Sequence, residues 1–108
     1  MDELDVASEF GELRRDLHAT HQRAQRAVNR IALLEELNYD VGEEEVRLRY
    51  LLADILETRS FMTDARQRIK KGAVLGEKVR DLFYDVAEDV ELAKATLEDI
   101  RLPKIRSI

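Results

Sequence analysis

The 108-residue chain contains no cysteine and no tryptophan, and it has only one proline and four glycines. Without cysteine it can form neither a disulfide framework nor a thiolate metal site, which fits a reducing compartment. So few glycines and prolines leave few positions at which a helix must stop. Charged residues make up 38% of the chain and hydrophobic residues 44%. This composition favours a few long helices around one apolar core, and the length predicts a single domain.

Long apolar runs and clustered basic charge are also missing. No stretch approaches the roughly 18 apolar residues that a membrane-spanning helix needs. The opening MDELDVASEF is acidic and lacks the apolar region of a signal peptide. We therefore expect a soluble, cytoplasmic protein with no membrane partner. The 18 basic and 23 acidic residues alternate along the chain and give a formal net charge of −5. Nucleic acid is not an expected partner, because phosphate binding needs a clustered basic surface.

A seven-residue repeat predicts a first helix over residues 5–38. Asp5 and Ser8 are both acceptable N-caps for it. The middle of its apolar stripe consists of small side chains, so neighbouring helices can approach closely there. Two additional apolar positions widen the stripe, as expected for a helix that contacts two others. The stripe comprises Phe10, Leu13, Leu17, Thr20, Ala24, Ala27, Ile31, Leu34 and Asn38, with Val28 and Leu37 beside it.

Two breaks divide the rest of the chain into two further helices. Asn, Asp and Gly in residues 38–42 tolerate turn geometry, and three glutamates then favour a helix start. The second helix is expected over residues 43–71, with Gly72 in a left-handed conformation after it. The third is expected over residues 77–102, before Pro103. The predicted core positions are Leu48, Leu51, Leu52, Ile55, Thr58, Met62, Ala65 and Ile69, then Val79, Leu82, Phe83, Val86, Val90, Ala93, Leu97 and Ile100.

These elements predict an all-α fold. Two short connections require each helix to run antiparallel to the one before it. We expect an elongated, antiparallel three-helix bundle, up-down-up and spectrin-like in shape. Asp89 occupies a position of the third helix at which a strict heptad would place an apolar residue, so its stripe drifts around the helix as a 3.6-residue period does.

Few residues are candidates for chemistry. His18 and His21 are three residues apart on one helix, a spacing that can serve a metal, but the pair has no evident third ligand. The acidic clusters at Glu43–Glu45 and Glu88–Glu91 lie in polar sequence, where nothing would raise a carboxyl pKa for catalysis. No serine lies in a nucleophile elbow, and no glycine pattern forms a phosphate loop. We expect no enzymatic activity, cofactor, metal or small-molecule substrate.

The surface is therefore the remaining candidate for function. The heptad places Tyr50 and Leu56 on the outer side of the second helix and Tyr84 on the outer side of the third, while Tyr39 lies in a turn. Single exposed apolar residues are ordinary. Tyrosines surrounded by arginine and glutamate are also typical of protein-protein interaction surfaces.

The stretch ADILETRSFMTDARQRIKKG, residues 53–72, resembles the second helix of the tubulin-binding cofactor A family. Members of this family are small tubulin-folding chaperones. The shared pattern is an Ala-acid-Ile-Leu run, a Glu/Ser/Arg cluster, a methionine and a Gln-Arg-rich end. TLEDIRLPK, residues 96–104, is similar to the end of that family. The lengths agree, and the resemblance implies a three-helix bundle.

The resemblance also implies a function. The protein would capture β-tubulin released from the chaperonin, keep it soluble and pass it on for heterodimer assembly, without nucleotide or metal. We expect the contact face on the outer side of the second helix and its neighbour, the third. The predicted partner-binding residues are Tyr50, Leu56, Glu57, Arg59, Ser60, Arg66, Gln67 and Tyr84. The alternative is a structural or adaptor coiled-coil bundle that mediates protein-protein association, since a heptad seam can also pair between chains.

Overall fold

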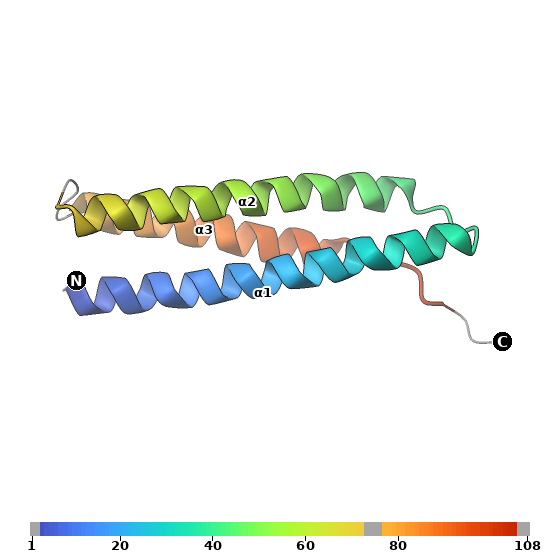
Figure 1. Cartoon of the computed structure of the whole chain (residues 1–108), viewed down its shortest axis with the longest axis horizontal. Helices are drawn as coiled ribbons and strands as arrows, with labels where there is room; N and C mark the ends of the chain where they lie inside the picture. The colour runs from blue at the N-terminus through green and yellow to red at the C-terminus, as the bar shows by residue number, and fades with distance from the viewer. Residues whose placement is uncertain (1–2, 73–76, 106–108) are drawn as a thin grey trace.

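The computed structural model describes residues 3–72 and 77–105 as three long helices that pack against one another (Figure 1). They are α1 (Glu3–Glu36), α2 (Gly42–Lys70) and α3 (Glu77–Asp99). Each runs antiparallel to the one before it, which confirms the predicted all-α, up-down-up three-helix bundle. The rod measures 58 × 20 × 17 Å. Its radius of gyration of 17.3 Å exceeds the roughly 13 Å of a compact chain of this length, so the bundle is elongated as expected.

The core runs along the axis of the rod and consists of the predicted stripes. Thr20 is the one polar residue in the middle of the α1 stripe, and its hydroxyl donates a hydrogen bond to the backbone oxygen of Asp16 at 2.8 Å. It is therefore buried without an unsatisfied donor. The hydrophobic side chains that are buried include Phe10, Leu17, Ala24, Ile31, Leu34, Leu48, Leu51, Ile55, Met62, Ala65, Val86, Val90, Ala93, Leu97 and Ile100. These positions confirm the helical periodicity.

The ends of α1 differ from the prediction. The helix begins at Glu3, so Asp5 and Ser8 lie inside it and do not cap it. The helix ends at Glu36, two residues before the predicted end. Asn38 adopts a φ of 66° in the turn, and Leu37 beside it is 48% exposed. Neither extends the buried stripe as predicted.

The turn between α1 and α2 is closed by backbone hydrogen bonds. The N–H of Tyr39 donates to the oxygen of Leu34 at 2.9 Å, and the N–H of Asn38 donates to Glu35 at 3.0 Å. Asparagine tolerates the left-handed conformation that this closure requires. Val41 is buried against the core, and Tyr39 packs partly on it. The short turn thus fixes the antiparallel approach of α1 and α2.

The other helix ends follow from the same chemistry. Gly72 has a φ of 73°, as predicted, and its N–H donates to the oxygen of Ile69. The rest of the second break, residues 73–76, lies outside the described residues. At the other end, α3 stops at Asp99, before the predicted Leu102. The N–H of Ile100 donates to the oxygen of Leu97 at 3.2 Å, the tighter i−3 pattern of a helix end, and the Ile100 side chain is buried.

Candidate partner-binding surfaces

All eight predicted partner-binding residues lie at the surface. Tyr50 is 71% exposed, Tyr84 59% and Leu56 52%. The polar members are exposed as well: Glu57, Arg59, Ser60, Arg66 and Gln67. On the same stretch of α2, Ile55 and Met62 are buried. The division of residues 53–72 into an inward and an outward side is therefore as the sequence predicts.

The eight residues do not share one face of the rod. Glu57 lies on the side of α2 that meets α3. The pKa of His21 in α1 is lowered, first by its partial burial and then by the positive charges of Arg59 and His18. Arg59 therefore lies near α1. Tyr84 packs edge-on against Phe83 with ring centroids 5.8 Å apart. Phe83 in turn packs edge-on against Phe10 of α1, with ring centroids 5.6 Å apart.

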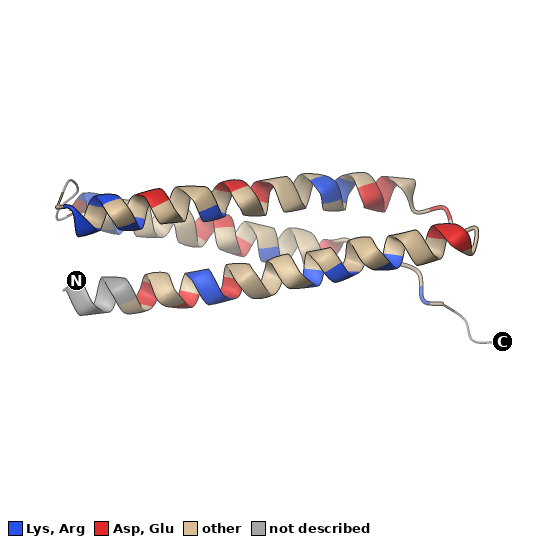
Figure 2. Cartoon of the chain, in the orientation of Figure 1, with Lys and Arg blue, Asp and Glu red and all other residues tan. Residues whose placement is uncertain are grey.

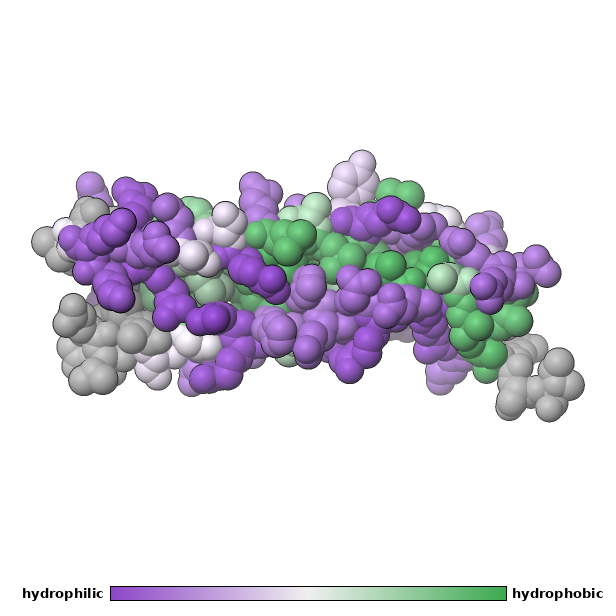
Figure 3. Space-filling view, in the orientation of Figure 1, coloured by the Kyte–Doolittle hydropathy of each residue, from purple (hydrophilic) through white to green (hydrophobic). Residues whose placement is uncertain are grey.

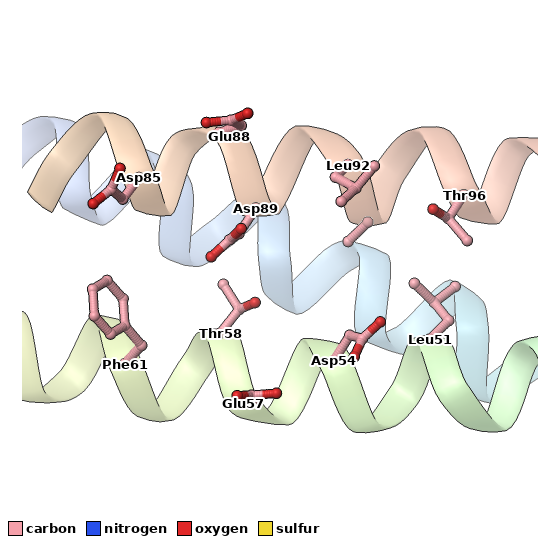
Figure 4. Close-up of a pocket in the computed structure, with 11 residues that line it drawn as sticks. Leu51, Asp54, Glu57, Thr58, Phe61, Asp85, Glu88, Asp89, Leu92 and Thr96 are labelled. Carbon is pink, nitrogen blue, oxygen red and sulfur yellow. The ribbon is translucent and has the colours of Figure 1, made fainter. Parts of the chain in front are cut away.

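A groove lies between α2 and α3. This α2–α3 groove has a volume of about 630 Å³ and is open to solvent. Figure 4 shows its two walls facing each other, with Phe61 opposite Asp85 and Thr58 opposite Asp89. One wall consists of Leu51, Asp54, Glu57, Thr58 and Phe61, and the other of Asp85, Glu88, Asp89, Leu92, Ala93 and Thr96.

The walls of the α2–α3 groove are acidic. Five of its lining residues are aspartate or glutamate, and none of the described residues that line it is basic. Figure 2 shows these acidic segments of α2 and α3 next to each other near the middle of the rod. The apolar side chains within the groove include Phe61, 38% exposed, and Leu92, 64% exposed. The groove therefore combines negative charge with accessible apolar surface.

Cross-helix ion pairs occur elsewhere. Lys94 of α3 reaches Asp16 of α1 at 3.7 Å and Glu91 of its own helix at 3.4 Å. These carboxylates, Glu91 first, raise the pKa of Lys94. Arg47 of α2 pairs with Asp99 of α3 at 2.8 Å, near the start of α2 and beyond the end of the acidic groove.

The turn end of the rod carries a small network of its own. Glu45 accepts hydrogen bonds from Arg49 at 2.8 and 3.2 Å. A hydrogen bond with Glu45 raises the pKa of Glu35, which links the end of α1 to the first turn of α2. Figure 3 shows apolar side chains exposed among hydrophilic ones in the middle of the rod and near this end. Leu33, Leu37 and Val46 are among the exposed apolar residues.

The other candidates from the sequence remain dispersed. His18 is exposed and His21 is half-buried beside the α1 stripe, as expected for residues outside the core. Among the described residues, no three histidine, aspartate or glutamate side chains are grouped to hold a metal ion. Within the same ranges, no helix is both long enough and apolar enough to cross a membrane.

The α2–α3 groove itself was not predicted from the sequence. Its one signal was Asp89, a charged residue at a position that a strict heptad would make apolar. In the structure Asp89 is exposed and forms part of the groove wall. No family model, curated protein or solved structure matches the chain. The residues and their geometry therefore carry the functional argument.

Proposed function

We propose that the protein is a tubulin-folding chaperone that captures and stabilises β-tubulin by surface binding and passes it on for heterodimer assembly, without catalysis. The observation that supports this is the two-sided character of residues 53–72. The segment resembles a helix of the tubulin-binding cofactor A family, and its outward residues, including Leu56 and Arg59, remain exposed for a partner.

A rigid rod suits such a role. The helices pack around a continuous core, so little chain has to be ordered when a partner binds, and a preorganised surface loses little entropy on association. Alternating arginine and glutamate along α2 would steer the encounter and set its register. Because exposed charges are screened by salt, capture is expected to weaken as ionic strength rises.

We place the centre of the proposed contact at Leu56, on the side of α2 that faces away from the core. Apolar residues at the centre of an interface carry more of its free energy than charges at its rim. Five other predicted residues of α2 would surround it: Tyr50, Arg59, Ser60, Arg66 and Gln67. Glu57 would extend the contact toward α3. Tyr84 of α3 would lie at the edge of the contact.

The test is to mix the purified protein with β-tubulin released from chaperonin and to separate the mixture on native gels. We expect a discrete complex with β-tubulin and none with an α-tubulin control. Leu56→Asp combined with Arg59→Glu should weaken the complex while the circular dichroism of the helices stays unchanged. Leu33→Asp, at an exposed position of α1, is the matched control and should bind as the wild type does.

Two results would contradict the proposal. Absence of a complex with β-tubulin would reject the chaperone function. A complex that survives the Leu56→Asp, Arg59→Glu change would reject the contact face and keep the function.

The shape of the rod favours a second candidate, a structural or adaptor bundle. The described residues begin and end at opposite ends of a rod 58 Å long, as suits a spacer between other components (Figure 1). The heptad row of α1, which could have paired with a second chain, is buried inside the bundle. If the adaptor bundle assembles with itself, sedimentation should show an oligomer that grows with protein concentration. A monomer up to high micromolar concentration would reject self-assembly.

A further inference from the structure

The flanks of packed helices normally carry opposite charges, which pair across the seam and fix the helices against each other. The α1–α3 side of the bundle follows this rule through Lys94 and Asp16. Among the described residues, the ion pair on the α2–α3 side is Arg47 with Asp99, near one end. Farther along the two helices, both walls of the groove carry carboxylates and no basic residue.

This arrangement leaves the α2–α3 groove without internal compensation. Asp54 of α2 extends toward α3 and Asp89 of α3 extends toward α2 (Figure 4), and Glu57, Asp85 and Glu88 also line the groove. Like charges held on facing walls repel each other, and a basic group placed between them would relieve that repulsion. The groove is therefore electrostatically complementary to a positively charged ligand that can span both walls.

The apolar residues of the groove define the shape of that ligand. Phe61 lies on the α2 wall and Leu92 on the α3 wall, offset along the rod (Figure 4). The α2 wall extends from Leu51 to Phe61, a length of about 15 Å at the helical rise of 1.5 Å per residue. A ligand with an apolar row and cationic flanks over that length would satisfy both features. An amphipathic helix of about ten residues, or three turns, has this form.

We propose that the α2–α3 groove is a docking site for a basic amphipathic helix of another protein. An aliphatic row of that helix packs on Phe61 and Leu92. Lysine or arginine side chains on its two flanks reach the carboxylates of the walls. The third helix of the bundle, α1, lies behind the groove and supports both walls.

This inference goes beyond the chaperone proposal and does not rest on it. It comes from the α2–α3 groove, whereas the tubulin contact is centred on Leu56. Glu57 belongs to both surfaces, so it is left unchanged in the tests. The groove variants should capture β-tubulin as the wild type does, which separates failure of one proposal from failure of the other.

The probe is a synthetic peptide of about 14 residues in which leucine forms one helical face and lysine the other. Its control is a peptide of the same composition, scrambled so that no apolar face forms. Calorimetry with the full chain measures both affinities at low and moderate salt. We expect the amphipathic peptide to bind at least tenfold more tightly than the scrambled one, because only it can place leucine on Phe61 and Leu92.

Two sets of variants locate the binding. Asp85→Asn, Glu88→Gln and Asp89→Asn together remove three charges from the α3 wall and should reduce the affinity at least tenfold. The control variant combines Glu12→Gln, Glu36→Gln and Glu98→Gln, which change the net charge equally at exposed positions outside the groove. This variant should change the affinity for the peptide less than twofold. Leu92→Ser should weaken binding, whereas Leu33→Ser should not.

Three outcomes would overturn the proposal. Equal binding of the two peptides, or equal loss in the two triple variants, would mean attraction to net charge alone. Amide shifts of labelled protein that change away from Phe61 and Leu92 would place the peptide elsewhere. A dimer of the wild type that dissociates in the Asp85→Asn, Glu88→Gln, Asp89→Asn variant would put a second copy of this chain in the groove.

Discussion

The two sides of α3 meet their neighbours by different chemistry. Toward α1, Phe83 packs edge-on against Phe10, and Lys94 approaches Asp16. Toward α2, the same helix contributes the buried Ala93 but also places Asp89 in a groove whose walls are acidic. The apolar interior is continuous behind both sides.

This difference separates what holds the bundle together from what its surface is for. Burial of the apolar stripes supplies most of the stability, because exposed ion pairs contribute little each. The α2–α3 side, whose middle presents carboxylates without such a pair, can persist because the core beneath it is sufficient. Its charges are then free to serve a partner.

The largest expected effect comes from the core that both sides share. Ile55→Ala should lower the free energy of unfolding by about 2–5 kcal/mol, because it removes fully buried methyl groups and leaves a cavity. Leu56→Ala, at the next position, should change it by less than about 0.5 kcal/mol, because the side chain is half exposed. Urea unfolding followed by circular dichroism measures both. Similar losses for the two variants would contradict the assignment of inward and outward sides.

A smaller effect is expected from exchanging charges between the two sides of α3. Asp89→Lys would place a cation in the acidic groove and should stabilise the protein by about 0.2–1 kcal/mol, the range of an exposed ion pair. Lys94→Glu would remove the approach to Asp16 and set like charges together, so it should lower the urea midpoint. If Asp89→Lys is destabilising, the walls are not in repulsion.

The smallest effect concerns the α1–α2 side, where His21 has a lowered pKa. Between this lowered value and the ordinary 6.5, the unfolded chain binds more protons than the folded one. Stability should therefore fall as pH decreases through that window and be fully retained above it. Arg59→Gln removes one of the causes and should raise the pKa of His21, although partial burial still lowers it. A ring-proton titration by NMR measures this, and an unchanged or lower pKa in the variant would contradict the contact.

The sequence was sufficient for the interior of each helix and not for its ends. The seven-residue spacing of Phe10, Leu17 and Ala24 identifies buried positions directly, because only one face of a helix can meet its neighbours. The end of α1 involves the left-handed Asn38, and α3 ends at Asp99 with an i−3 hydrogen bond from Ile100 to Leu97. The heptad spacing does not specify such backbone conformations at helix ends.

The candidate surfaces depended on information that a single helix does not contain. Exposure of Leu56 follows from spacing alone. The α2–α3 groove requires the register between two helices, which brings Phe61 opposite Asp85 and Thr58 opposite Asp89. That register follows from how the core side chains of the two helices pack. The charge at Asp89 showed where the stripe departs from a heptad, but not what it would face.

The most direct test of this account is the urea midpoint of the Asp85→Asn, Glu88→Gln, Asp89→Asn variant against that of the wild type. The Glu12→Gln, Glu36→Gln, Glu98→Gln variant controls for the change in net charge. If the groove carboxylates are kept for a partner at some cost in stability, the groove variant unfolds at higher urea than both other proteins. If it unfolds at lower urea, these carboxylates stabilise the free bundle, and the groove is not left open for a basic helix.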